Sequence, residues 1–562
     1  MDNSQIRIGQ INLQGARDAT DEILASARKL GLDLLAVQEH YQRDNTGFMQ
    51  TSQAAEAAIV TAGERTACAF LSELSNDYCS CAHVRTNTGD VYLVSAYFKY
   101  SHRIEPHLEH LQHIINVLKG KKIIICADTN THSPVWHSRE QQYIGRGSEA
   151  EERRAQMECF LAQNALNVEN REGQPPTFSG PGGTSNIDIT VTSRGVIVDD
   201  WKVIEGVSLS DHQLIVVEVN VGEGRGSTTS EVAATSSLLR RFRDRDVNWD
   251  RFRTRLKSCA GALDGRVSAE EYARELCALI ERAAHECLGE YKTNSTNRYE
   301  WWNARLDALR RRFGSVRRRW QKYKKTGRAT ENARVMFVRL RSEYRRAMAE
   351  AQESHFRDMA DSGNENPWGL AYRTSAGRSK TPGNVINCIR FGEGSASSVD
   401  DAIKAMLYAL LPDDDPATDS VHHRQIRIAA LTSPSGAPAP PIRAGRAEMN
   451  LMYEKCVREG IFPGIWKEGR LVVLPKGNDR PATDPKAYRP LTLLPVFGKI
   501  LERVIIQLTR EVLDSLSGEQ HGFTKGRSTV TALTDILGAV GASASKYVQL
   551  VFLDISGAFD NA

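Results

Sequence analysis

Carboxylates, amides and one histidine recur beside apolar segments in the first 212 residues. They lie in four short strings: Gln10-Ile-Asn12, Ala36-Val-Gln-Glu39, Cys126-Ala-Asp128-Thr-Asn130 and Ser210-Asp211-His212. Hydrolysis of a phosphodiester needs a divalent cation on a phosphate oxygen, a base for the attacking water, and donors for the extra negative charge of the transition state. These side chains can bind the cation, act as the base and supply the donors. The strings therefore predict a metal-dependent phosphodiesterase site.

The segments around these strings predict strands that carry the polar residues to one rim. The apolar run Leu32 to Val37 precedes Glu39, and Ile123 to Cys126 precedes Asp128. The other members are placed similarly: Asn12 in or just after Ile6 to Asn12, Asp188 in the alternating Asn186 to Val191, and Asp211-His212 before Leu214 to Val219. A lone acid at a strand end is usually a turn former, and a lone histidine is more often structural. The ordered set, however, favours a site.

In this order, the set resembles the endonuclease/exonuclease/phosphatase family, whose members include DNase I and the apurinic-site endonucleases, over roughly residues 1–221. The resemblance implies that Glu39 is the principal metal ligand and that Asn12 and Asp211 help to hold metal and phosphate. It implies Mg²⁺, with Mn²⁺ as an alternative.

The same resemblance gives roles to the remaining members. Asp128 and Asn130 would orient water and phosphate, and Asp188 would hold His212, which stabilises charge or moves a proton. Whether Asp128 or His212 is the base stays open. The supporting positions are Tyr97, which could equally be a core strand residue, Thr177, for which a purely structural role is favoured, and Ser210.

Length and composition favour a multidomain protein without a membrane segment. The 562 residues exceed what one core usually holds, and no run approaches the ~18 apolar residues of a membrane span. The amino terminus lacks the pattern of a secretory signal. The ten cysteines are scattered, and neither Cys79-Ser-Cys81 nor the group Cys277, His285 and Cys287 has the spacing of a zinc site, so we predict no zinc.

Positive charge is concentrated in one segment. From Trp301 to Arg346 there are sixteen Lys or Arg and three acids, a net charge of +13 in a chain whose total is +4. Apolar residues at helical spacing predict two helices around the turn Lys325-Thr-Gly-Arg328, folded as an antiparallel hairpin with arginines outside. A solvated coiled-coil face is the alternative, but nucleic-acid binding is favoured because the face carries almost one sign of charge. The predicted phosphate-binding residues are Arg310, Arg311, Arg312, Arg317, Arg318, Arg319, Lys322, Lys324 and Lys325.

A second set of motifs occupies the last hundred or so residues. These are Glu459 to Lys467, Arg470 to Lys476, Tyr488 to Pro495, Gln520 to Ser528 and Leu553-Asp-Ile-Ser-Gly-Ala-Phe559. They resemble the fingers and first palm strand of a LINE-type reverse transcriptase. Val548 to Leu553 would be the strand that delivers Asp554 to a two-metal site, and Phe559 would be the steric gate. Lys476 and Arg489 would reach phosphates, although ordinary surface charge explains them equally well. Because the paired aspartates of the family are missing, we expect no polymerase activity from this chain.

Nuclease first and reverse transcriptase second is the order of a non-LTR retrotransposon polyprotein, and Tyr97 to Ser101 and Asp128 to Ser138 resemble the arthropod elements that insert into ribosomal genes or telomeric repeats. The resemblance implies nicking of double-stranded target DNA, copying of element RNA from the nick, nuclear residence and a partner protein from the first reading frame. The alternatives are a decayed remnant that only binds nucleic acid, and a stand-alone repair nuclease or phosphatase.

We therefore expect an α/β chain in five parts. Residues 1–221 would form a four-layer sandwich of two mainly antiparallel sheets, with helices at Asp18 to Leu30, Phe48 to Ala62 and Pro106 to Leu118 outside. A flexible linker would follow at 222–237, then a basic helical region with the hairpin at 238–360, a poorly ordered connector at 361–445, and an incomplete fingers and palm fragment at 446–562.

Overall fold

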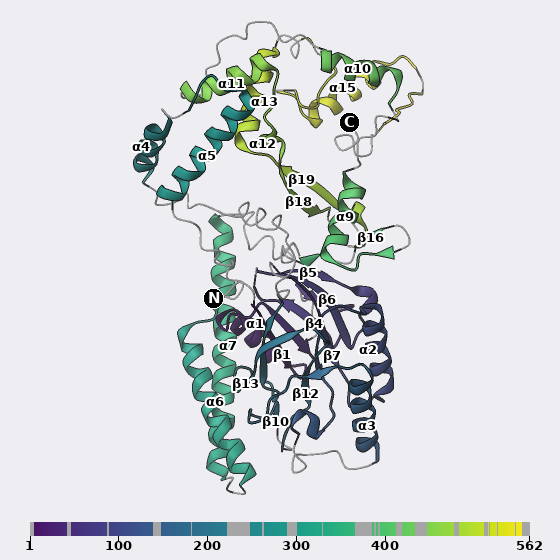
Figure 1. Ribbon diagram of the computed structural model, residues 1–562, viewed down its shortest axis with the longest axis vertical. Helices are drawn as coiled ribbons and strands as arrows, with labels where there is room; N and C mark the ends of the chain where they lie inside the picture. Colours follow the sequence, from purple (N-terminus) through teal and green to yellow (C-terminus); the bar gives the residue numbers. More distant parts are fainter. Residues whose placement is uncertain are drawn as a thin grey trace. The chain divides into compact units, whose positions relative to one another are not determined.

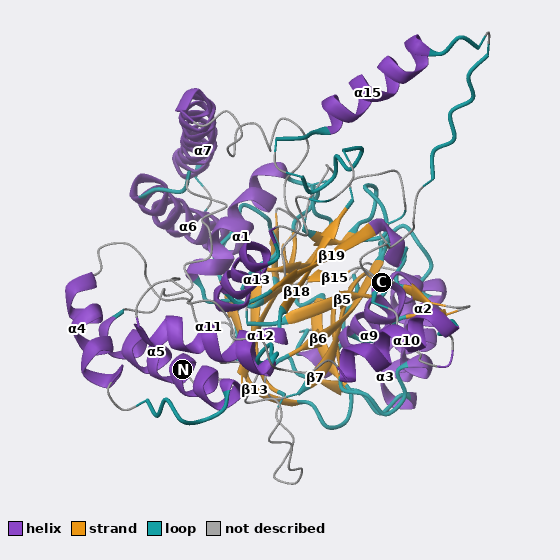
Figure 2. Cartoon of the chain, turned by 90° about the horizontal axis from the view of Figure 1, so that it is seen from above, coloured by secondary structure: helices purple, strands orange, loops and turns teal. Residues whose placement is uncertain are grey.

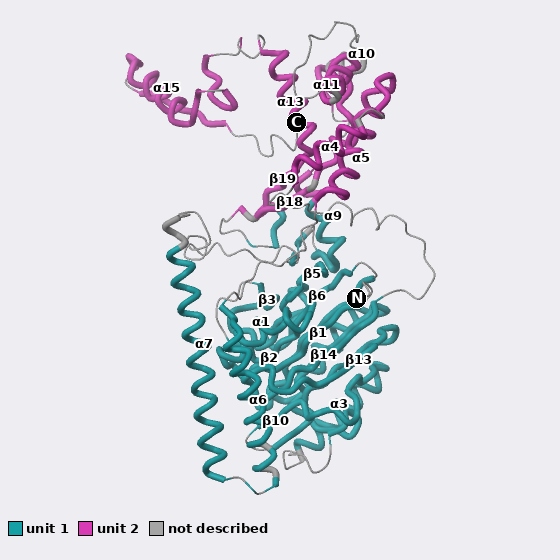
Figure 3. The backbone as a smooth tube through the Cα atoms, turned by 90° about the vertical axis from the view of Figure 1, so that its left-hand side faces the viewer, with its two compact units in different colours: residues 1–234, 293–406, 481–485 teal, residues 235–292, 407–480, 486–562 magenta. Residues whose placement is uncertain are grey.

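The computed structural model divides into two compact units (Figure 3). The first comprises residues 1–234, 293–406 and 481–485, and the second 235–292, 407–480 and 486–562. The structure describes residues 5–41, 47–63, 65–86, 89–138, 148–180, 183–221, 248–260, 263–288, 301–326, 328, 330–365, 385–386, 389–391, 394–411, 417, 419–432, 447–476, 481, 483–510, 515, 518–524, 526–545 and 547–553.

Two sheets lie face to face in the first unit. In the described residues, the first sheet has the order β13 (Ile197–Ile204), β14 (Leu214–Asn220), β1 (Gln5–Asn12), β2 (Leu34–Gln38), β4 (Ala57–Thr61) and β3 (Phe48–Met49). The second, in that same part of the chain, has the order β15 (Val385–Ile386), β5 (Ala67–Phe70), β6 (Cys79–Arg85), β7 (Asp90–Tyr97), β8 (Ile123–Asp128), β12 (Asp188–Thr192) and β9 (Asn167–Val168). Most neighbours are antiparallel, and β1–β2, β7–β8 and β5–β15 are parallel.

Central strands are apolar on both faces because both faces are covered. In β14, Ile215 and Val217 point between the sheets, whereas Leu214 and Val216 join the core under the helices. This is the alternation that a period of two residues requires, with each face buried against a different layer.

Helices cover the outer face of each sheet (Figures 1 and 2). Helix α1 (Arg17–Lys29) packs on the first sheet, and α2 (Glu105–Val117) and α3 (Ser148–Gln163) pack on the second. The four-layer sandwich predicted from the sequence is confirmed, and so are the helices expected at Asp18 to Leu30 and Pro106 to Leu118.

The prediction of a helix from Phe48 to Ala62 is wrong. This segment forms β3 and β4, and β4 pairs antiparallel with β2 from Ala57–Gln38 to Thr61–Leu34. The β-branched residues at the end of β4 fit a fully buried strand, and pairing with β2 overrides the helix preference of the alanines.

The predicted helical hairpin is present and packs on the nuclease-like sandwich. Helices α6 (Ala304–Lys325) and α7 (Glu331–Glu365) run side by side (Figure 1), and their apolar stripes join the core beneath α1. The buried members are Leu306, Leu309, Phe313, Leu340, Tyr344, Ala347 and Met348. Because these side chains share one core with the first sheet, the hairpin is a fifth layer of the first unit.

The connector predicted to be poorly ordered, 361–445, contains regular structure in its described parts. Helix α7 continues to Glu365, β15 extends the second sheet at β5, and α9 (Val399–Leu410) and α10 (Val421–Thr432) follow. Between β15 and α9 in the chain, the short strands β16 (Arg390–Phe391) and β17 (Gly394–Ser395) pair with each other. The Arg85 guanidinium binds the Asp400 carboxylate, and the Val399 N–H donates to His83 Nδ1 at 3.2 Å. The start of the connector is thus fixed to the sandwich.

The second unit has a small helical core and a two-stranded ladder. Besides α10, it contains α4 (Trp249–Ala260), α5 (Ala269–Cys287), α11 (Ala447–Glu459), α12 (Gly464–Lys467), α13 (Val496–Leu508), α15 (Thr529–Ala542) and the antiparallel pair β18 (Arg470–Pro475) and β19 (Tyr488–Leu493). Tyr272 of α5, Tyr453 of α11 and Trp466 of α12 pack together. The basic helical region expected at 238–360 is therefore divided, with α4 and α5 in this unit.

The strand predicted at Val548 to Leu553 is not formed. Among the described residues they pair with no other strand, and they are exposed, Leu553 at 91%. The predicted linker, 222–237, lies outside the described residues. Within the described part of the chain, no helix combines the length and the apolar character needed to cross a membrane.

Candidate nuclease site

Strand ends bring the predicted residues together at one edge of the sandwich. Parallel pairing of β1 and β2 sets Asn12 beside Gln38, so Glu39 follows directly. Parallel pairing of β7 and β8 sets Tyr97 beside Asp128, and β12 opposes Asp188 to Asp128. Asn12 and Asp128 are the last residues of their strands. The rim expected from the sequence is therefore present.

Asn12 links the two sheets at this edge. Its side-chain amide donates to Glu39 Oε2 at 2.8 Å and to Asp128 Oδ2 at 2.7 Å. Its Oδ1 accepts the Gln14 N–H at 2.8 Å. Glu39 has a φ of 42°, a left-handed conformation that a non-glycine residue adopts at a cost. The turn after β2 thereby holds the Glu39 carboxylate against Asn12.

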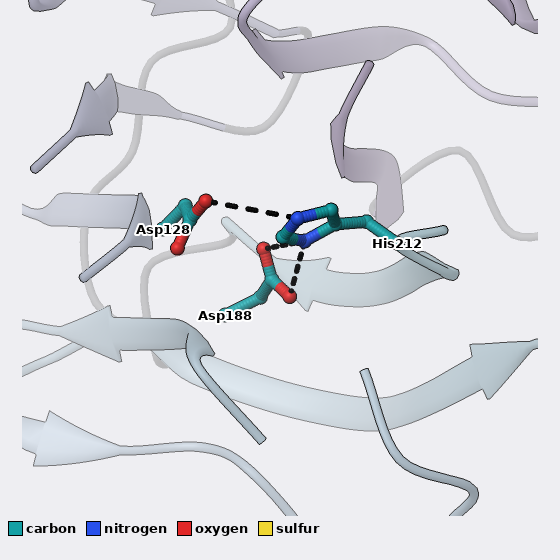
Figure 4. A group of neighbouring side chains, drawn as sticks. All are labelled: Asp128, Asp188 and His212. Carbon is teal, nitrogen blue, oxygen red and sulfur yellow. Dashed lines mark hydrogen bonds and ion pairs between the residues drawn. The ribbon is translucent and has the colours of Figure 1, made fainter. Parts of the chain in front are cut away.

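Asp128, Asp188 and His212 form a buried triad (Figure 4). His212 Nδ1 lies 2.9 and 3.0 Å from the two Asp188 oxygens, and Nε2 lies 4.0 Å from Asp128 Oδ2. All three residues are at most 5% exposed. Because Asp188 accepts from Nδ1, the other ring nitrogen faces Asp128 and the site.

Burial and mutual charge shift the titration of this triad. Burial raises the pKa of Asp128, and the negative charge of Asp188 raises it further. Burial lowers the pKa of His212, but the charge and hydrogen bond of Asp188 and the charge of Asp128 outweigh it and raise the pKa overall. The arrangement favours an imidazolium held between two carboxyl groups.

The supporting residues contact the same edge. Burial and the negative charges of Glu39 and Asp128 raise the pKa of Tyr97, so its hydroxyl stays a donor. Asn130 donates its N–H to Asp128 Oδ1 at 3.1 Å and its side-chain amide to Phe98 O at 3.1 Å. Thr177 Oγ1 accepts the Asp188 N–H at 3.3 Å, and Ser210 Oγ donates to Asn12 O at 2.6 Å.

Asp211 differs from the other predicted residues because it is paired with the hairpin. Its Oδ1 accepts from Arg317 Nη2 at 2.9 Å, and its N–H donates to Gln14 Oε1 at 2.9 Å. The prediction that Arg317 lies outside and meets phosphate is wrong, since Arg317 is only 5% exposed. The helix turn that carries Arg317 packs against the loop before His212, and this packing had no signal in the local pattern of charges.

Two polar residues to which the sequence motifs gave no role, Gln10 and Arg153, hold the edge in place. Gln10, on β1, donates to Ala127 O and Ile189 O at 3.2 and 3.1 Å, which joins the two sheets beneath the triad. Arg153, on α3, donates to Phe98 O, Thr129 O and His102 O within 3.3 Å. The only sequence signal for Gln10 was its position inside an apolar strand.

The remaining predicted cations take several positions on α6. Arg310 is half-buried, donates to Ser26 Oγ at 2.6 Å and lies 5.4 Å above the Trp302 ring. The exposed ones are Arg311, Arg312, Arg318, Arg319 and Lys322. The side chains of Lys324 and Lys325 lie outside the described residues.

Trp136, on the loop after Asn130, is fully buried and donates to Thr131 O, so it fills the core of its own loop.

The polymerase-like residues lie in the second unit. Lys476 follows β18 and donates to Lys486 O at 2.9 Å, and Arg489 is exposed on β19 opposite Leu474. Asp554 and Phe559 lie outside the described residues.

The oxygen donors at the edge fit a hard divalent cation. The Glu39 and Asp128 carboxylates both accept from the Asn12 amide nitrogen, so two carboxylates lie close together, while the Asn12 amide oxygen accepts the Gln14 N–H. Carboxylate and amide oxygens are the ligands that Mg²⁺ and Mn²⁺ prefer. A cation there would also offset the repulsion between the buried acids.

Two family models match the chain. Residues 91–216 match the model described as endonuclease-reverse transcriptase, and residues 474–562 match that of reverse transcriptase (RNA-dependent DNA polymerase). The first match contains Tyr97, Asp128, Asp188, Asp211 and His212. The order of the two matches is the order predicted from the sequence motifs.

Similar proteins come from insect mobile elements. The chain is 29% identical over 527 residues to a retrovirus-related Pol polyprotein from type-1 retrotransposable element R1 of Bradysia coprophila, covering 87% of this chain and 52% of that polyprotein. It is 26% identical over 589 residues to a putative 115 kDa protein in element R1DM of Drosophila melanogaster, covering 98% of this chain and 57% of that protein. The chain thus spans about half the length of these curated relatives.

Among solved structures, the chain is similar to the endonuclease domain of TRAS1, a telomere-specific non-LTR retrotransposon. The identity is 25%, the TM-score is 0.35, and the similarity covers 39% of this chain and 100% of that one. The family models and the curated relatives agree on one class of protein. The chain is similar to polyproteins of type-1 retrotransposable elements, and along its length a match to an endonuclease-reverse transcriptase model is followed by a match to a reverse transcriptase model.

Proposed function

We propose that the sandwich is a divalent-metal-dependent DNA endonuclease that nicks one strand of target DNA. The observation that carries this proposal is the hydrogen-bond chain from Glu39 through Asn12 to Asp128, next to the Asp188–His212 pair. It combines oxygen ligands for a cation with a group that can donate or accept a proton, as phosphodiester hydrolysis requires.

Each residue has a role that follows from its contacts. Glu39, with Asn12 and Asp128 beside it, would hold Mg²⁺, or Mn²⁺ as the alternative, and the bound cation would polarise a phosphate oxygen. Nε2 of His212 and Oδ2 of Asp128 face each other across 4.0 Å, so a proton leaving the attacking water has an acceptor in this pair. Asp188 would keep the ring oriented, and the Tyr97 hydroxyl, which is hydrogen-bonded to Glu39, would turn to the phosphate as a donor when DNA binds.

The test is relaxation of supercoiled plasmid by the full chain with Mg²⁺ or with EDTA. We expect conversion to open circles with Mg²⁺ and none with EDTA. Without a cation, the negative charges of the acids at the edge would repel the negatively charged phosphate. Linear DNA would appear only after many nicks if single strands are cut. Absence of nicking by folded protein on any DNA would contradict the proposal and favour a remnant that only binds nucleic acid, or a different phosphoester.

We also propose that the exposed face of the hairpin holds the DNA that flanks the cut. Arg311, Arg318 and Lys322 form one row on α6 at helical spacing, and all three are exposed. Such cations neutralise phosphates without reading bases, and they make affinity dependent on salt. Base choice would then rest on loops and on DNA deformability.

Replacing Arg311, Arg318 and Lys322 together by Gln is expected to lower the slope of log affinity against log salt by up to about 3, because each lost phosphate contact removes close to one released ion. The measurement is DNA binding by fluorescence anisotropy between low and physiological salt. A matched control replaces Lys119, Lys121 and Arg194, which lie at the opposite end of β8 and β12 from the site. An equal slope in both triple variants would contradict the hairpin surface.

For the whole polyprotein, the proposal places this nick at the start of reverse transcription. The 3′ hydroxyl at the nick would prime copying of the element's RNA by the reverse transcriptase domain. Target DNA and element RNA would then be its nucleic-acid partners, with a first-reading-frame protein as a further partner. This work would take place in the nucleus.

A further inference from the structure

The loop that carries Asp211 and His212 is held from outside by α6. Arg317 donates from Nη1 to Ser208 O at 3.1 Å, and from Nη2 to Ser210 O at 2.6 Å and to Asp211 Oδ1 at 2.9 Å. The three acceptors lie within four residues of one loop. A planar guanidinium fixes such a set better than any other side chain because its donors point in set directions.

Close backbone packing brings the helix to this loop. A Cβ added at Gly206 would lie 3.4 Å from Gly314 Cα, and one added at Gly314 would lie 3.8 Å from Gly206 Cα and O. At these two glycines, α6 therefore lies in van der Waals contact with the segment before the loop. Arg317, three residues after Gly314, then reaches the carbonyls of the loop.

Glu22 of α1 connects the same loop to the second helix of the hairpin, α7. Glu22 Oε2 accepts the Leu209 N–H at 2.8 Å, and the Tyr344 hydroxyl of α7 donates to Glu22 Oε1. Burial raises the pKa of Glu22 to about 8. The polar contacts of α1, α6 and α7 thus meet at Ser208 to Asp211, whose last member adjoins His212.

We propose that Arg317 is a positioning residue of the endonuclease, and that the hairpin, encoded after the linker, completes the catalytic edge in cis. Arg317 fixes the backbone of Ser208 to Ser210 and orients the Asp211 carboxylate, which stands next to His212. The inference rests on the proposed nuclease activity. It adds that a residue far along the chain, outside the sandwich, sets the rate of nicking.

The first test is single-turnover nicking by the full chain with Arg317→Met. Partners that orient the groups of a metal site typically contribute 10–100-fold. We expect the saturating rate to fall by about that factor, with the DNA concentration at half-maximal rate changed less than about threefold. The rate of Arg317→Lys, which keeps the positive charge but not the planar set of donors, should lie between those of wild type and Arg317→Met. Arg357→Met is the control, since Arg357 is exposed on α7 and pairs only with Glu353 within the described contacts.

A double-mutant cycle separates positioning from general loss of structure. Because Arg317 and Asp211 share one network, Arg317→Met should lower the rate by a smaller factor in an Asp211→Asn chain than in wild type, and the remaining effect would come from the lost contacts to the Ser208 and Ser210 carbonyls. Independent effects that multiply would overturn the proposal. So would a large rise in the half-maximal DNA concentration at an unchanged rate, which would make Arg317 a DNA contact.

A measurement without DNA keeps the inference distinct from the nuclease proposal. Hydrogen exchange of the amides of Ser208 to His212 should quicken at least about tenfold in Arg317→Met, while exchange in β8 stays unchanged. If wild-type protein does not nick, the nuclease proposal fails and exchange still decides the contact. If wild type nicks but neither rate nor exchange responds to Arg317→Met, the inference fails and the nuclease stands.

Discussion

His212→Asn should lower the rate of nicking about 10³-fold, within the 10²- to 10⁴-fold range of a lost general acid or base. An Asn side chain can still donate to Asp188 but has no atom at the place of Nε2, which faces Asp128 at 4.0 Å. The measurement is the single-turnover rate on supercoiled plasmid at saturating protein and Mg²⁺. Asp188→Asn should also be slow, because an amide oxygen orients the ring without the charge that stabilises an imidazolium.

His113→Asn is the matched control, since His113 is exposed on α2. It should nick at the wild-type rate. Equal rates for wild type and His212→Asn would remove the ring from the reaction. A fall in both histidine variants would indicate instability rather than chemistry, which thermal unfolding of each protein would reveal.

Glu39→Gln should lower the rate of nicking by about 10³-fold at millimolar Mg²⁺, because the proposed principal anionic ligand of the cation is lost. The amide keeps the size of the side chain and an oxygen for Asn12 to donate to. Without metal, stability should not fall, since one negative charge next to Asp128 is removed. With metal, wild type should gain stability by ligand linkage and Glu39→Gln should gain little.

Thermal unfolding with and without Mg²⁺ measures that difference, and Glu109→Gln on α2 is the control. A Glu39→Gln protein that is stabilised by Mg²⁺ as strongly as wild type would show that the cation binds elsewhere. A variant that unfolds early without metal would instead give Glu39 a structural role in the turn after β2.

The sequence predicted which residues meet at this edge better than it predicted what packs around them. Asn12, Glu39, Asp128, Asp188 and His212 could be found because each stands at the end of an apolar run, and strand ends meet at sheet edges. That logic needs only local periodicity. It succeeds wherever the neighbour in space is an adjacent strand of the same regular sheet.

Arg317 illustrates what local periodicity cannot give. In the sequence it is the first of three consecutive arginines. Arg318 and Arg319 are exposed, whereas Arg317 is buried. Gly314 lies next to Gly206, and Arg317, three residues later, is the arginine that bonds the loop, a tertiary contact that the local pattern does not contain. The helix predicted from Phe48 to Ala62 was wrong for a related reason, because pairing of β4 with β2 determines the secondary structure of this segment.

The pairing of β15 with β5 has a consequence for synthesis of the protein. Val385 lies opposite Cys68, so the last strand of the second sheet leaves the ribosome roughly 300 residues after its partner. At a translation rate of ~5–20 residues per second, the edge of β5 stays unpaired for about 15–60 s. An open edge can pair with another chain. Expression of the sandwich without residues 385–386 would make that interval permanent, so the yield of monomer should depend on the connector as much as on the nuclease itself.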